Sequence, residues 1–100
     1  MYAHGQGVSQ DSAEALQWFR LAAVQGLAEA LYNLGVMYLN GQGVARDEVQ
    51  AYKWLDLAAA TYTTKSERDE AGKTRDSVAT HMTPAQIAEA QKLAREWKKQ

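Results

Sequence analysis

The chain has 100 residues, of which 46% are apolar and 23% charged, and its formal net charge is −1. This length accommodates one compact domain or a short array of repeats, and the apolar fraction is that of a globular protein, which excludes wholesale disorder. The near-neutral charge gives no positive field for nucleic acid or anionic membranes. There is no cysteine, which excludes disulfides, thiolate metal sites and a cysteine nucleophile.

The sequence gives no sign of membrane insertion or export. No wholly apolar run is longer than four residues, as at 36–39, against about 20 residues for a helix that spans a bilayer. The first residues lack the basic and apolar regions of a signal peptide. As written, the chain is expected to be cytoplasmic, or periplasmic or secreted if its N-terminus is truncated, and the compartment itself stays open.

A repeat of 36 residues organises the first 60 positions. Between 1–24 and 37–60, twelve of the 24 aligned pairs are identical. The identical pairs include Asp11 with Asp47 and Trp18 with Trp54, together with a Gly-Gln-Gly-Val segment at 5–8 and 41–44. A period of this size is typical of arrays of helix pairs, which favours an all-α fold.

The predicted elements follow one another in chain order. After a glycine loop at 5–7, Asp11 is expected to cap a helix over 11–25 that buries Trp18, with Gly26 as its left-handed stop. A second helix is expected to end before a glycine loop at 40–43, and Asp47 starts a third that buries Trp54.

The last 40 residues keep only part of the repeat. A mostly solvated helix is predicted between positions 62 and 82, with its acidic and basic side chains forming ion pairs three and four residues apart. A final helix starts at Thr83 and Pro84, where Gln86 completes a capping box and Met82 and Ile87 can form a hydrophobic staple. Five helices are expected in all.

The repeat resembles the Sel-1-like repeat, a relative of the tetratricopeptide repeat. The residues that carry the resemblance are Ala30, Leu34, Gly35, Tyr38, Gly41, Gly43, Val44, Asp47, Ala51, Trp54, Ala58 and Ala59. The segment 82–91 is similar to the C-terminal capping segment of many bacterial members. The resemblance implies a right-handed α/α solenoid of helix-turn-helix repeats that acts as a non-catalytic protein-interaction scaffold or adaptor.

On this interpretation the chain is a single repeat domain, residues 1–100. It comprises a partial repeat (1–26) that lacks its first helix, a full repeat (27–62) and a degenerate capping repeat (63–100). The missing helix predicts a terminal fragment that caps a longer array, or a chain that forms a homodimer through its open N-terminal repeat face.

The remaining motifs do not predict catalysis, a metal or a cofactor. The glycine loops lack the Lys-Ser or Lys-Thr of a phosphate-binding loop. His4 and His81 are isolated, whereas a metal site needs three or four converging ligands. The serines have no nucleophile-elbow context. A β-lactam-binding hydrolase, an activity of some cysteine-rich relatives, is a disfavoured alternative because the cysteines and a Ser-Lys pair are absent.

A binding surface is predicted on the one complete first helix. Tyr32, Asn33, Val36 and Asn40 lie at spacings of three and four, along a line separate from its apolar stripe. First helices line the concave side of such solenoids. We expect these four residues to contact a partner peptide or protein, with the amides pairing to its backbone.

Overall fold

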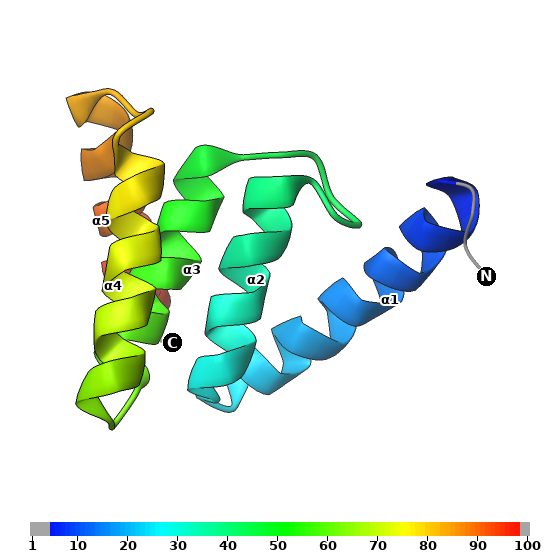
Figure 1. Ribbon diagram of the computed structural model, residues 1–100, viewed down its shortest axis with the longest axis horizontal. Coiled ribbons are helices and arrows are strands. Elements are labelled where there is room, and N and C mark those ends of the chain that lie inside the picture. Colours follow the sequence, from blue (N-terminus) through cyan, green and yellow to red (C-terminus); the bar gives the residue numbers. More distant parts are fainter. Residues whose placement is uncertain (1–4, 99–100) are drawn as a thin grey trace.

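The computed structural model describes the backbone of residues 5–98 and the side chains of residues 13–97. This part of the chain forms five helices and no strand, which confirms the predicted all-α class. The helices are α1 (Gly5–Val24), α2 (Ala28–Asn40), α3 (Glu48–Thr61), α4 (Lys65–Ala79) and α5 (Pro84–Lys98). Successive helices run back and forth in a helical-repeat solenoid (Figure 1).

The predicted signals set most of the helix ends. Gly26, at φ 83°, follows α1, and Gly41, at φ 70°, ends α2, both in the left-handed region that glycine adopts without strain. At the start of α3, the Asp47 carboxylate accepts the backbone N–H of Gln50 at 3.1 Å. The expected ends of α1 and α2 and the expected start of α3 are therefore confirmed.

Both helices of the C-terminal pair begin with a side-chain cap. The Thr83 hydroxyl accepts the backbone N–H of Gln86 at 3.1 Å, and the Gln86 side chain accepts that of Thr83 at 2.9 Å. This is the predicted capping box of α5. Thr64 caps α4 by accepting the backbone N–H of Glu67.

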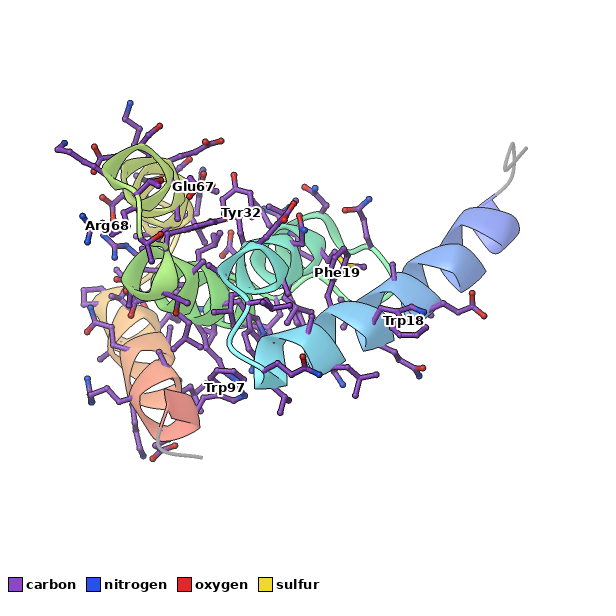
Figure 2. All side chains as sticks on the ribbon, turned by 90° about the horizontal axis from the view of Figure 1, so that it is seen from below. Trp18, Phe19, Tyr32, Glu67, Arg68 and Trp97 are labelled. Carbon is purple, nitrogen blue, oxygen red and sulfur yellow. The ribbon has the colours of Figure 1, made fainter. Side chains whose placement is uncertain are left out.

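The core lies around α3, which packs against α2, α4 and α5. In Figure 2, α4 and α5 lie on opposite sides of α3, and α2 lies beside α3. Gly35 of α2 allows the closest approach, because a Cβ there would lie 2.6 Å from the Leu55 Cγ of α3. Between α3 and α5, the Trp54 and Trp97 rings meet edge to face with centroids 5.2 Å apart.

The prediction for the start of the first helix is wrong. A loop was expected at 5–7 with a helix from Asp11, but α1 already begins at Gly5. In the second repeat, hydrogen bonds to the end of the preceding helix hold the equivalent loop. There the backbone N–H groups of Gln42 and Asp47 bond to the carbonyls of Met37 and Tyr38 at the end of α2. The equivalents of those two carbonyls belong to residues 1 and 2, outside the described residues.

The predicted burial of Trp18 is also wrong. Its side chain is 71% exposed, and Leu21 is 60% exposed. The face of α1 that packs on the core includes Leu16, Phe19 and Ala23, and it excludes Trp18. In Figure 1, α1 leaves α2 at an angle and diverges from the other helices. Among the described residues, α3 packs extensively on α5, whereas α1 does not pack to a similar extent on α3.

Candidate functional site

A pocket of about 260 Å³ lies between α2 and the beginning of α4. It is lined by Glu29, Tyr32, Asn33, Tyr62, Glu67 and Glu70, a set that we call the α2–α4 pocket. Two aromatic rings, one amide and three carboxylates therefore converge from two helices and the turn between α3 and α4. Figure 2 shows Tyr32 and Glu67 on the side where α2 faces α4.

The Tyr32 side chain links the two helices that form this pocket. It is half-buried, and its hydroxyl lies 3.3 Å from the Thr74 Oγ1 of α4. The Thr74 hydroxyl in turn donates to the Glu70 carbonyl at 3.0 Å. These contacts hold the ring in one orientation while leaving part of it accessible.

The pocket is electrostatically negative within the described residues. Burial raises the pKa of the Tyr62 phenol above 10.0, and the carboxylates of Glu67 and Glu29 raise it further because they disfavour a phenolate. None of the three glutamates that line the pocket forms an ion pair among residues 13–97. A positively charged group would therefore complement this surface.

The structure brings together two of the four predicted binding residues. Tyr32 and Asn33 line the α2–α4 pocket. Val36, half-buried, and Asn40, exposed, lie further along α2 and do not line it. Sequence reasoning missed the contribution of Tyr62 and the α4 glutamates, since it treated the acidic residues of α4 only as members of surface ion pairs.

Some of those expected ion pairs are present and serve the fold. Lys65 and Asp69 pair at 2.9 Å across one helical turn, and this contact lowers the pKa of the Asp69 carboxyl. Arg75 reaches Asp56 of α3 at 3.0 Å and thereby ties α4 to α3. Glu67 instead accepts a hydrogen bond from the Thr64 hydroxyl at 2.8 Å, next to the pocket.

A second hollow, of about 550 Å³, lies between the end of α1 and the helices α3 and α5. It is lined by Arg20, Val24, Tyr38, Asp47, Gln50, Lys53, Trp54 and Trp97, which we call the α1–α3–α5 groove. Here Arg20 donates to the Tyr38 hydroxyl at 2.7 Å. No feature of the repeat pattern predicted this groove, because it depends on the angle at which α1 leaves α2.

The described residues contain no cluster of three or more metal-ligating side chains. His81 lies beside the Thr80 hydroxyl at 3.3 Å, whereas His4 is outside the described part. None of the described helices has both the length and the apolar composition to cross a bilayer.

The successive helix pairs and the glycine stops that recur between them define a helical repeat protein. Comparison with known families makes this specific: the Sel1 repeat matches residues 1–27 and again residues 28–60. The chain therefore belongs to the Sel1 repeat family. A comparison with curated proteins finds no match. Sel1 repeats are generally protein-interaction modules and typically non-catalytic, which agrees with the scaffold class inferred from the sequence.

Proposed function

We propose that the chain is a non-catalytic scaffold that binds a basic segment of a partner protein in the α2–α4 pocket. The observation that carries this proposal is the meeting of Tyr32 and Tyr62 with three glutamates in one hollow. A lysine or arginine side chain can stack on an aromatic face and pair with a carboxylate. The Asn33 amide can bond to the backbone of the bound segment.

The rest of the α2 surface extends this proposal. Val36 and Asn40 continue from Tyr32 and Asn33 along the same helix, and a segment that enters the pocket with a basic residue can run along them. Val36 then provides apolar contact, and Asn40 a second amide.

Binding to an array of blocked peptides with one varied position tests the proposal. We expect peptides with arginine or lysine to bind best. Tyr32→Ala and Glu67→Gln should each lower the affinity for these peptides about tenfold, as for residues that anchor an interface. Glu89→Gln, an exposed substitution on α5, is the matched control and should leave binding unchanged. Preference for acidic peptides, or binding unaffected by Tyr32→Ala, would overturn the assignment.

A specific observation favours self-association as a second candidate function. Four apolar side chains in the second half of α1 or just after it are more than half exposed: Trp18, Leu21, Val24 and Leu27. Apolar side chains gathered in this way often mark an interaction surface, and a second copy would provide the homodimer expected from the open N-terminal repeat. Light scattering over a hundredfold concentration range tests this, with Leu21→Ser expected to abolish any dimer.

A further inference from the structure

The α1–α3–α5 groove contains two cations without a carboxylate partner. Within residues 13–97, neither Arg20 nor Lys53 lies within ion-pair distance of an acidic side chain. The one carboxylate that lines the groove, that of Asp47, already accepts the backbone N–H of Gln50 as the cap of α3. The groove is therefore positively charged in excess.

The cations of the groove adjoin apolar walls. The Lys53 ammonium lies 4.2 Å from the centroid of the Trp54 ring, and Trp97 and Val24 complete the lining from α5 and α1. Trp54 is only 6% exposed, and its Nε1–H is buried without an acceptor. An unpaired buried donor costs free energy.

The burial of Lys53 and its repulsion by Arg20 favour the same kind of ligand, one with a negative charge. Burial, and secondly the charge of Arg20, lower the pKa of Lys53 below 10.5, so the charged form is penalised when the groove is empty. A negative charge placed between the two cations removes that penalty. A neighbouring apolar side chain would cover the exposed part of the Trp97 indole and the Val24 methyl groups, which are otherwise in contact with water.

We propose that the α1–α3–α5 groove is a second binding site, for a partner segment in which an acidic side chain stands next to an apolar one. The carboxylate lies between Arg20 and Lys53, and the apolar side chain packs against Val24 and Trp97. This site is separate from the α2–α4 pocket and opposite to it in charge preference. The chain can then join a basic segment of one partner to an acidic segment of another.

The test uses blocked peptides with a central Glu-Leu, Gln-Leu or Lys-Leu pair, titrated into the ¹⁵N-labelled full chain. We expect the Glu-Leu peptide to move the indole N–H signals of Trp54 and Trp97 and to bind about tenfold more tightly than its Gln counterpart. Lys53→Met should remove this discrimination, and Lys53→Glu should transfer the preference to the Lys-Leu peptide. Lys92→Met, on the exposed side of α5, is the matched control.

Several results of these titrations would overturn the proposal. They are equal affinity for the Glu and Gln peptides, an unchanged preference in Lys53→Glu, or tryptophan shifts that follow protein concentration alone, which would mean that a second copy fills the groove. A peptide with a free C-terminal carboxylate and no acidic side chain that binds more tightly than the blocked Glu-Leu peptide would also contradict it. The variant Tyr32→Ala separates the two sites, since it should weaken basic peptides and leave these titrations unchanged.

Discussion

Trp18 and Trp54 occupy the same position of two successive repeats, yet Trp18 is 71% exposed and Trp54 only 6%. The difference arises from their neighbours. Trp54 lies in α3, which has a helix pair packed on its far side, and its ring meets the edge of Trp97. Trp18 lies in α1, and among the described residues this helix packs extensively only on α2. A residue's place in the repeat therefore does not decide its burial; the helices around it do.

This difference predicts unequal costs for the same substitution. Trp54→Ala should lower the free energy of unfolding by about 3–5 kcal/mol, as large-to-small changes of buried aromatics do. Trp18→Ala should change it by less than about 0.5 kcal/mol, as an exposed substitution does. Urea denaturation followed by circular dichroism measures both. Equal losses would show that Trp18 is buried in solution, by another copy or by a different position of α1.

Two helical glycines should respond in opposite directions to alanine. At Gly35 a Cβ would lie 2.6 Å from the Leu55 Cγ and 3.2 Å from the Ala51 carbonyl oxygen. Leu55 is fully buried and has no room to retreat. Overpacking of this kind typically costs about 1–3 kcal/mol, and the better helix propensity of alanine offsets only part of it.

Gly72 of α4 is the matched control for Gly35. Its added Cβ would have only the Arg75 Nη2 within 4 Å, at 3.7 Å. Gly72→Ala should therefore stabilise the chain by about 0.5–1 kcal/mol through helix propensity and a less flexible unfolded state. If both alanine variants shift the urea midpoint in the same direction, the close approach of α2 and α3 is not as the structure has it.

Local signals predicted the fold well. The glycines at 26 and 41 and the caps at Asp47 and Thr83 act within four residues of themselves, so they can be recognised without tertiary information. The path of α1 could not be predicted in this way. Its start and its buried face depend on which helices pack against it, and a repeat alignment assumes that each unit has the same neighbours.

The two candidate sites show the same contrast between local signals and tertiary packing. Tyr32 and Asn33 were predicted because they lie four and three residues before Val36 on one helix. Their neighbour Tyr62 lies in the turn after α3, and Glu67 and Glu70 lie in α4, so only tertiary packing brings these side chains to the same pocket. The groove at Arg20 and Lys53 depends on three helices, so no single helical pattern could reveal it.

The capping box of α5 gives a further prediction. Thr83→Ala removes the acceptor for the Gln86 backbone N–H, which leaves a helix-start donor without its partner. The free energy of unfolding should fall by about 1 kcal/mol, within the usual range of about 0.5–2 kcal/mol for such caps. Thr83→Ser keeps the hydroxyl and should retain most of the stability in the same urea measurement. A loss as large for serine as for alanine would mean that the Thr83 methyl group, and not its hydroxyl, matters.

The proximity of Lys53 and Arg20 in the α1–α3–α5 groove predicts the direction in which the free energy of unfolding changes with pH. Burial, followed by the charge of Arg20, lowers the pKa of Lys53 below 10.5. Between that lowered value and 10.5 the unfolded chain holds more protons than the folded one, so this group makes the free energy of unfolding rise with pH across the window. Below the window the charged Lys53 opposes folding in full.

Titration of the Lys53 side chain by NMR measures the pKa of Lys53 directly. Arg20→Gln should raise this pKa toward 10.5 without reaching it, because burial is the larger cause and remains. Added salt should have a similar but smaller effect, since it screens the charge of Arg20 and leaves the burial of Lys53 unchanged. Arg68→Gln, an exposed substitution on α4, should leave the titration as it is. If Arg20→Gln also leaves the pKa of Lys53 unchanged, the two cations do not share the groove.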